Sequence, residues 1–225
     1  MYYIDFDNTL YETSQMSKDT LKALAAAIVK CRREMDKDDP HAKHLTEKFV
    51  LDDLTSIFNS SVENFYGFAK RLAVRYHVRI DPLKAAIYKT IVLNGKKYVY
   101  PDAIRFLQKL KEEGEFACLL TYVAIPQNLH QQANKLDGSG IMQYVTEVYC
   151  TTRDKGQLEI DYANPNNVFI DDNPRELESY YKAGARNLIR ISKPNNERRT
   201  SKPLDLPIKV PNYDSFDKIK IQRHR

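Results

Sequence analysis

The chain has few cysteines and no long apolar segment. Only three of its 225 residues are cysteine (Cys31, Cys118 and Cys150), and they lie far apart without CxxC spacing. That pattern argues against a disulfide framework and against a cysteine-based zinc site. No segment reaches the roughly 18 consecutive apolar residues that a membrane span needs, and Asp5 and Asp7 interrupt the first apolar run. We therefore expect a cytoplasmic protein without a signal peptide or a membrane anchor.

Charge of one sign does not dominate either. The formal net charge is +5, and some of it lies in the last few residues. A mildly basic chain suits anionic substrates, but a nucleic-acid-binding protein usually shows a denser basic stripe with interleaved aromatics. We therefore do not expect a nucleic-acid partner. The oligomeric state cannot be read from the sequence.

Glycine is nearly missing from the first part of the chain, where Gly67 is the only one before Gly95. Between about Ser17 and Asn94 the apolar residues recur at helical spacing, with almost no strand signal. The predicted helices begin after Ser17, cover residues 45–58, follow Ser61 and begin at Pro82. This part of the chain should form an all-helical module.

The rest of the chain alternates between strands and helices. The predicted strands cover residues 1–6, 116–120, 145–149, 167–170 and 187–191, and the predicted helices cover residues 102–113, 128–136 and 175–182. Such alternation indicates an α/β fold, in which a parallel sheet carries helices on both faces. The carboxyl ends of the strands then meet at one edge, where open parallel sheets bind ligands.

Two of these predicted strands end in paired acidic residues. Asp5 and Asp7 follow the first strand, and Asp171 and Asp172 follow the strand over residues 167–170. Carboxylates this close repel each other unless a cation joins them, and Mg2+ suits them because it prefers oxygen ligands. The alternative is that both pairs are solvated aspartates in loops. This is the weaker explanation when two strands of one sheet end in the same way.

A hydroxyl and an amine lie between the two acidic pairs. Thr121 ends the apolar run of the second strand, and Lys155 precedes the last acidic pair in Asp154-Lys155-Gly156. A transferring phosphoryl group needs such groups for positioning and charge neutralisation. Arg153 is an alternative to Lys155 if Lys155 is exposed.

In order and spacing these residues resemble the four motifs of the haloacid dehalogenase-like hydrolase superfamily. Asp5-Phe6-Asp7-Asn8-Thr9 looks like the first motif, DxDxT, Thr121 like the second, Lys155 like the third, and Asp171-Asp172 like the fourth. The resemblance extends over nearly the whole chain. It implies a Rossmann-like parallel-sheet core in residues 1–12 and 98–225, with an inserted all-helical cap of the family's first type in residues 13–97.

The resemblance also implies roles for individual residues. Asp5 would attack phosphorus, and Asp7 would protonate the leaving group and then activate water. Thr121 and Lys155 would hold the phosphate. An acid at Asp7 favours a phosphatase, because the family's dehalogenases generally lack an acid at that place.

The implied metal is Mg2+. Its ligands would be Asp5, the backbone carbonyl of Asp7, and Asp172, with Asp171 in a supporting place. The sequence alone leaves open which of the last two aspartates binds the ion directly.

We therefore expect a Mg2+-dependent phosphomonoester hydrolase that acts through an aspartyl-phosphate on a small phosphorylated metabolite, such as a nucleotide or a sugar phosphate. One alternative is a phosphatase for a macromolecule, either a nucleic-acid end or a phosphoprotein, which a sizeable cap disfavours. Another is a non-catalytic binding protein of the same fold. Tyr66 and Phe68 are further candidates for substrate contact, and His41 and His44 form a weak metal-binding candidate, for which a solvated turn is the simpler interpretation.

Overall fold

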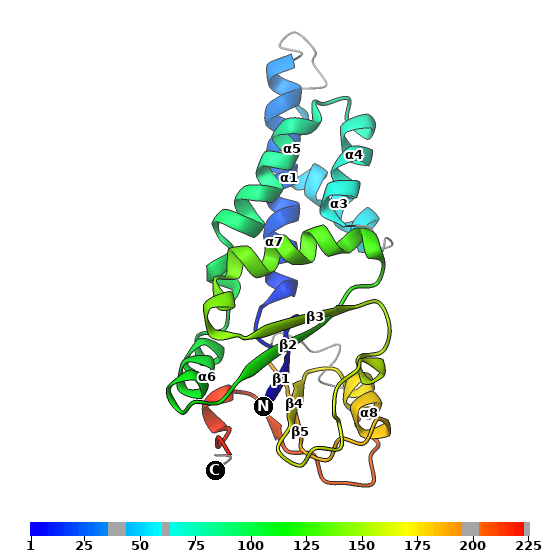
Figure 1. The fold of residues 1–225 in the computed structure, drawn as a ribbon. Helices are drawn as coiled ribbons and strands as arrows, with labels where there is room; N and C mark the ends of the chain where they lie inside the picture. The colour runs from blue at the N-terminus through cyan, green and yellow to red at the C-terminus, as the bar shows by residue number, and fades with distance from the viewer. Residues whose placement is uncertain (36–43, 60–63, 195–202, 223–225) are drawn as a thin grey trace. The chain divides into compact units, whose positions relative to one another are not determined.

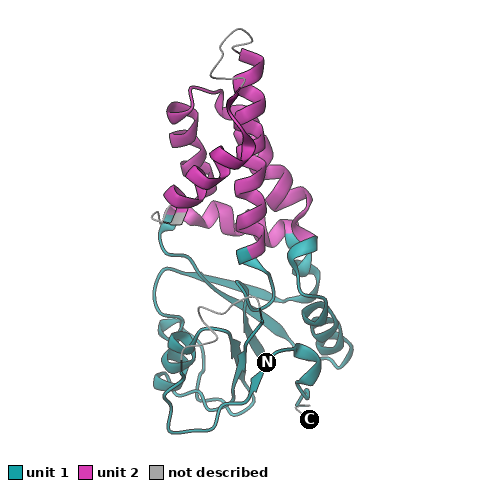
Figure 2. Cartoon of the chain, turned by 180° about the vertical axis from the view of Figure 1, so that it is seen from behind, with its two compact units in different colours: residues 1–14, 97–126, 139–225 teal, residues 15–96, 127–138 magenta. Residues whose placement is uncertain are grey.

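The computed structural model describes residues 1–35, 44–59, 64–194 and 203–222. The chain divides into two compact units, which Figure 2 colours separately. Unit 1 consists of residues 1–14, 97–126 and 139–225, and unit 2 consists of residues 15–96 and 127–138. His41 and the predicted helix start after Ser61 lie outside the described residues. Among the helices of the described ranges, none has both the length and the apolar character of a membrane-spanning segment.

Unit 1 is built on one parallel sheet of six strands, in the order β3-β2-β1-β4-β5-β6 (Figure 1). The strands are β1 (Tyr2–Asp5), β2 (Ala117–Tyr122), β3 (Glu147–Thr151), β4 (Val168–Asp171), β5 (Leu188–Ile191) and β6 (Asn212–Tyr213). The chain starts in the middle of the sheet, adds β2 and β3 on one side, and then returns to add β4, β5 and β6 on the other. This is the Rossmann-like order, and it confirms the predicted α/β fold class.

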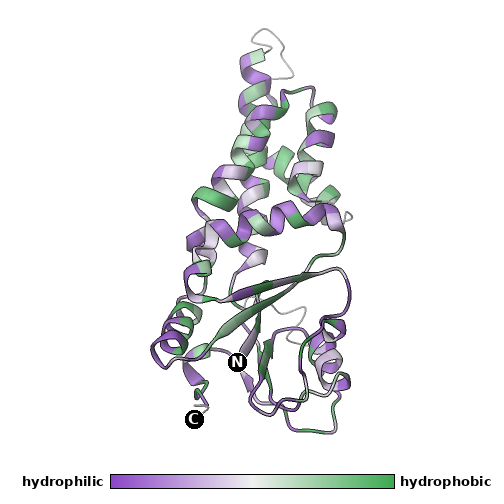
Figure 3. Cartoon of the chain, viewed as in Figure 1, coloured by the Kyte–Doolittle hydropathy of each residue, from purple (hydrophilic) through white to green (hydrophobic). Residues whose placement is uncertain are grey.

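Helices cover both faces of this sheet because successive strand residues point to opposite sides. On one side Tyr3 stacks on Phe169, whose ring also contacts Tyr180 of α8 (Pro174–Lys182). On the other side Tyr2 packs edge-on against Phe106 of α6 (Pro101–Glu112). Figure 3 shows the inner strands largely in the hydrophobic colour, whereas α6 and α8 carry both colours. Burial of these apolar side chains stabilises the layered arrangement.

The remaining elements of unit 1 are short helical turns. They are η4 (Ile141–Tyr144), η5 (Lys155–Gln157) and η6 (Phe216–Lys218). The turn η5 packs against α8, on the same face of the sheet as Tyr3. Cys31, Cys118 and Cys150 are all described, and no disulfide joins them.

All regular elements that the described residues form in unit 2 are helical. They are α1 (Thr13–Met35), α3 (Glu47–Asn59), α4 (Phe65–Arg75), α5 (Ile80–Tyr88), the π-helical turn η1 (Lys89–Leu93) and α7 (Leu129–Ser139). The first two residues of α1 belong to unit 1, and α7 begins after the turn η3 (Pro126–Asn128). The turn η2 (Gly95–Tyr98) lies at the boundary of the two units. Helix α7 joins unit 2 although it follows β2 in the chain. Its Gln131 side chain accepts the N–H of Phe65 (2.7 Å), at the start of α4.

Two of the candidates for substrate contact can now be placed within unit 2. Phe68 is fully buried, and its ring contacts Phe58. It is therefore a core residue of unit 2. Tyr66 is half-buried, and its hydroxyl oxygen accepts a hydrogen bond from the side chain of Asn134 (3.2 Å).

Helix α1 begins at Thr13, so the prediction that Ser17 caps it was wrong. The Asn8 side chain reaches from the preceding loop and accepts hydrogen bonds from the N–H and the hydroxyl of Ser14 (both 3.2 Å). A backbone N–H in the first turn of a helix needs an acceptor outside the helix. Because Asn8 supplies that acceptor, the helix starts one turn earlier than its own sequence indicates.

The second and third strands also extend beyond their predicted ends. Strand β2 continues through Thr121 to Tyr122, because both residues pair with β3, opposite Cys150 and Thr151. Thr121 is thus part of a strand rather than the residue after one. Pairing with a neighbouring strand, which local sequence cannot reveal, decides these strand ends.

Asp102 connects the start of α6 to the last part of the chain. Its Oδ2 accepts hydrogen bonds from Lys193 Nζ (2.5 Å), Ser215 Oγ (2.9 Å) and the N–H of Phe216 (2.8 Å). Burial by itself raises the pKa of the Asp102 carboxyl, but the hydrogen bonds from Lys193 and Phe216 bring it below its usual value. The ionised carboxylate therefore stabilises the folded state.

Replacing Asp102 with asparagine should lower the free energy of unfolding at neutral pH by about 2 to 3 kcal/mol, because the Lys193 ammonium, which is buried, loses its counter-charge. This difference in the free energy of unfolding should have its full size above about pH 4, where an aspartate of the unfolded chain is ionised. It should shrink as the pH falls through the lower pKa of the folded state. Urea unfolding of both proteins over this pH range measures the effect.

The matched control is Asp217→Asn. Asp217, in η6, forms an exposed ion pair with Arg105 of α6 (2.5 Å). Exposed pairs contribute little because water screens them, so this variant should unfold almost like the native protein. Equal losses in the two variants would contradict the role given to Asp102.

Candidate active site

The first acidic pair lies in a tight turn after β1. Asp5 is the last residue of the strand, and the N–H groups of Leu10 and Tyr11 both donate to the carbonyl of Phe6 (3.0 Å). Asn8 has a φ of 62°, in the left-handed region that asparagine tolerates better than most residues. The turn brings the Thr9 hydroxyl to Asp5, where it donates to Oδ2 (2.7 Å). Local sequence therefore orients one oxygen of the Asp5 carboxylate.

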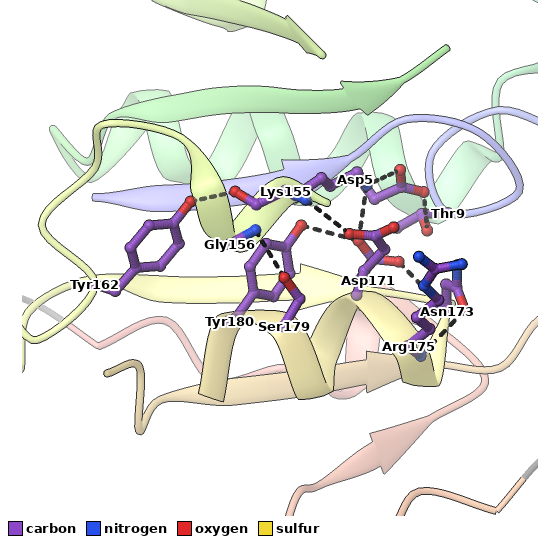
Figure 4. Close-up of polar contacts among 11 residues, drawn as sticks. Asp5, Thr9, Lys155, Gly156, Tyr162, Asp171, Asn173, Arg175, Ser179 and Tyr180 are labelled. Carbon is purple, nitrogen blue, oxygen red and sulfur yellow. Dashed lines mark hydrogen bonds and ion pairs between the residues drawn. The ribbon is translucent and has the colours of Figure 1, made fainter. Parts of the chain in front are cut away.

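Lys155 joins the two acidic pairs at the carboxyl ends of β1 and β4. Its Nζ donates to Asp5 Oδ1 (2.5 Å) and to Asp171 Oδ2 (2.8 Å), as Figure 4 shows. β1 and β4 are neighbours in the sheet, at the place where the strand order reverses. Ligands of open α/β sheets bind at this place. Lys155 is 2% exposed, Asp5 4% and Asp171 0%, so these charges interact with little screening by water.

Burial and neighbouring charges shift the ionisation of this cluster. Burial raises the pKa of the Asp5 carboxyl well above its usual value; Lys155 opposes the rise, and Asp171 and Asp172 add to it. Burial by itself would lower the pKa of the Lys155 ammonium, but Asp171 and Asp5 raise it above its usual value. Lys155 is thus a fixed cation among three buried carboxyl groups, which is an excess of acidic groups over cations.

A cation would relieve that excess. Among the described residues, Asp5, Asp171 and Asp172 form the group with metal-ligating atoms that all lie within 4.8 Å of one another, and all three are buried. Their donors are carboxylate oxygens, which Mg2+ prefers. The residues present therefore fit the ion that the motifs imply.

Asp171 is largely occupied by hydrogen bonds. Its Oδ1 accepts the N–H of Asn173 (2.9 Å), and its Oδ2 accepts the Tyr180 hydroxyl (3.0 Å) as well as Lys155. Asp172 is also fully buried and lies directly after β4. Both oxygens of Asp171 therefore already accept hydrogen bonds.

The other predicted residues lie close in the fold to this cluster. Thr121 is fully buried in β2, one residue beyond Leu120, which pairs with Asp5. Asp7 is half-buried, and its Oδ1 accepts a hydrogen bond from the Thr13 hydroxyl. Arg153, the alternative to Lys155, is exposed. Burial beside the acidic cluster thus favours Lys155 over Arg153.

Sequence reasoning missed the residues that hold Lys155 in place. The N–H of Lys155 donates to Glu176 Oε2 (3.0 Å), and the N–H of Gly156 donates to Ser179 Oγ (3.0 Å). The Tyr162 hydroxyl donates to the Lys155 carbonyl. Glu176 and Ser179 are three residues apart and share a face of the predicted helix. That spacing is visible in the sequence, but nothing there shows which loop the face would meet.

Comparisons with known proteins support the fold. No protein-family profile matches the chain, and no curated protein matches it in sequence. A solved HAD phosphatase from Thermococcus onnurineus is similar in structure, with a TM-score of 0.54 and 12% identity over 96% of this chain and 94% of that chain. A protein assigned as a haloacid dehalogenase-like hydrolase from Burkholderia xenovorans LB400 gives a TM-score of 0.58 and 17% identity over 94% and 90%. A protein assigned as a β-phosphoglucomutase from Thermotoga maritima gives 0.51 and 11% over 96% and 94%.

Proposed function

We propose that this chain, which has the haloacid dehalogenase-like fold, is a Mg2+-dependent phosphomonoester hydrolase that forms an aspartyl-phosphate on Asp5. The observation that carries the proposal is the buried Lys155 ammonium between Asp5 and Asp171 at the switch point of the sheet. A buried cation beside a carboxylate nucleophile suits a dianionic substrate, because it offsets the repulsion between that carboxylate and the phosphate.

In the first step Asp5 attacks phosphorus. One Asp5 oxygen exchanges its hydrogen bond with Lys155 or Thr9 for the new bond to phosphorus, and the ester bond to the leaving oxygen breaks. Asp7 gives its proton to that oxygen, so the alcohol leaves neutral. Lys155 has three N–H donors, of which its hydrogen bonds to Asp5 and Asp171 use two. The third can hold a phosphoryl oxygen, together with the Thr121 hydroxyl.

In the second step water displaces the Asp5 carboxylate from phosphorus. Asp7, now ionised, takes a proton from a water molecule whose oxygen bonds to phosphorus. The bond between phosphorus and Asp5 breaks, inorganic phosphate leaves, and both aspartates return to their starting states. Two displacements with a carboxylate nucleophile replace one difficult attack by water.

Mg2+ would be held by Asp5, the Asp7 carbonyl and Asp172. Asp171 would support the site indirectly, because Asn173, Lys155 and Tyr180 already donate to its oxygens. When bound, the ion supplies positive charge that stabilises the phosphoryl oxygens in the transition state.

The proposed substrate is a small phosphorylated metabolite. We assign catalysis to unit 1 and the role of a cap to unit 2, by analogy with the fold family. The names of the T. onnurineus and T. maritima proteins support phosphate chemistry on this fold. Specificity would then depend on unit 2.

The test is release of inorganic phosphate from para-nitrophenyl phosphate and a panel of phosphorylated nucleotides and sugars, with Mg2+ and with EDTA. We expect turnover that requires Mg2+ and returns when the ion is restored. Turnover that EDTA leaves unchanged would contradict the metal assignment. No release from any compound, with Mg2+ binding intact, would favour a macromolecular substrate or a non-catalytic role.

Gly156→Ala should lower kcat/KM by roughly tenfold. A Cβ at this position would lie 2.4 Å from the backbone oxygen of Ser179, which cannot move without shifting α8. The turn η5 would therefore move away from the helix and carry Lys155 with it. Steady-state kinetics with saturating Mg2+ measure the effect.

Gly114→Ala is the control for stability. Gly114 has a φ of +74° and nothing within 4 Å of an added Cβ, so alanine strains the backbone far from η5. This variant should lose stability but keep its kcat/KM. The assignment fails if both glycine variants lose activity in proportion to their stability.

A further inference from the structure

Tyr180 lies behind the catalytic cluster and belongs to none of the four motifs. It is a fully buried residue of α8, and its ring contacts Tyr162 and Phe169 (ring centroids 6.1 and 5.2 Å apart). Its hydroxyl donates to Asp171 Oδ2 (3.0 Å), the oxygen that also accepts Lys155. Figure 4 shows the Tyr180 hydroxyl and Lys155 directed at the same carboxylate.

We propose that Tyr180 is a positioning residue of the phosphatase site, whose hydroxyl holds the Asp171 carboxylate so that Lys155 stays against Asp5. The inference rests on the proposed function. The terminal torsion of an aspartate is broad, so one hydrogen bond does not define the plane of its carboxylate. The N–H of Asn173 on Oδ1 and Tyr180 on Oδ2 hold it at both ends.

The chain of contacts then continues toward phosphorus. Asp171 holds one N–H of Lys155, and Lys155 holds Asp5, whose other oxygen accepts Thr9. A lysine side chain has four flexible carbons, so its ammonium goes where its acceptors are. Tyr180 is therefore the buried end of a line of hydrogen bonds that ends at the nucleophile.

Tyr180→Phe tests the inference, because it keeps the ring and removes only the hydroxyl. We expect kcat/KM to fall about tenfold, mainly through a higher KM, because Lys155 binds the phosphate less well. Tyr3→Phe is the matched control. Tyr3 belongs to the same buried cluster and stacks on Phe169 (5.0 Å), and its hydroxyl is not among the described hydrogen-bond donors to Asp171. It should leave KM unchanged.

A second readout does not depend on turnover. The Nζ resonance of Lys155 in 15N-lysine-labelled protein can be identified because Lys155→Met removes it. The Lys155 resonance should shift in Tyr180→Phe and keep its position in Tyr3→Phe. The two variants should have equal melting temperatures. If the native chain hydrolyses no phosphoester, the proposed function fails and this resonance alone decides the role of Tyr180. Native kinetics and an unshifted resonance in Tyr180→Phe would overturn the inference, as would an equal shift in both variants.

Discussion

Asp5→Asn should lower kcat by roughly 1000-fold or more with every phosphoester that the native protein hydrolyses, because the amide cannot attack phosphorus. The variant should remain folded. Lys155 keeps its ion pair with Asp171 (2.8 Å) in this variant, so the amide leaves no buried cation unpaired. Acid quenching during turnover of a radiolabelled substrate should trap phosphoprotein from the native chain and none from the variant.

Asp161→Asn is the control for this experiment. Asp161 is exposed and lies on the surface loop before β4. Its loss should change neither kcat nor the amount of trapped phosphoprotein. An Asp5→Asn protein with native activity would eliminate the covalent mechanism, whatever the fold of the chain.

Lys155→Met should lower kcat/KM by roughly 100-fold or more, because the phosphoryl oxygens lose a preorganised buried cation. It should also lower the free energy of unfolding by about 3 kcal/mol, since Asp5 and Asp171 are left buried without their counter-charge. Kinetics at saturating Mg2+ and thermal unfolding of the same preparations measure the two effects. Added Mg2+ should restore part of the stability by binding the folded state.

Arg153→Met separates the two candidates for the motif-three cation. Arg153 is exposed, only two residues before Lys155. We expect this variant to keep native kcat/KM and native stability. The opposite result, in which Arg153→Met loses activity and Lys155→Met keeps it, would move the phosphate-binding role to Arg153 and remove the basis of the Tyr180 inference.

The sequence was informative about the inner strands of the sheet because their patterns are local. An apolar run that ends in an acid predicts a buried strand whose last residue meets solvent or ligand. This pattern placed β1 at residues 1–6 and β4 at residues 167–170, close to the observed Tyr2–Asp5 and Val168–Asp171. It did not reveal β6 (Asn212–Tyr213), which has only two residues and exists because β5 offers it an edge.

Helix boundaries were less predictable where the capping group comes from elsewhere. α6 and α8 each begin at a proline, Pro101 and Pro174, within one residue of the predicted starts. α1 begins at Thr13 because Asn8, in the turn after β1, accepts its N-terminal hydrogen bonds. The membership of α7 in unit 2 likewise depends on contacts such as that between Gln131 and Phe65.

By itself, then, the sequence determined the α/β class and the identity of the acidic residues, the lysine and the threonine proposed for the site, because strand ends and motif spacing are properties of short segments. Only the tertiary structure decided that Lys155 contacts Asp5, which is 150 residues away in the chain, and that Tyr180 contacts Asp171. Such contacts depend on the order of strands in the sheet and on how η5 packs against α8. These are consequences of burying apolar surface over the whole of unit 1, and no short segment of the chain contains them.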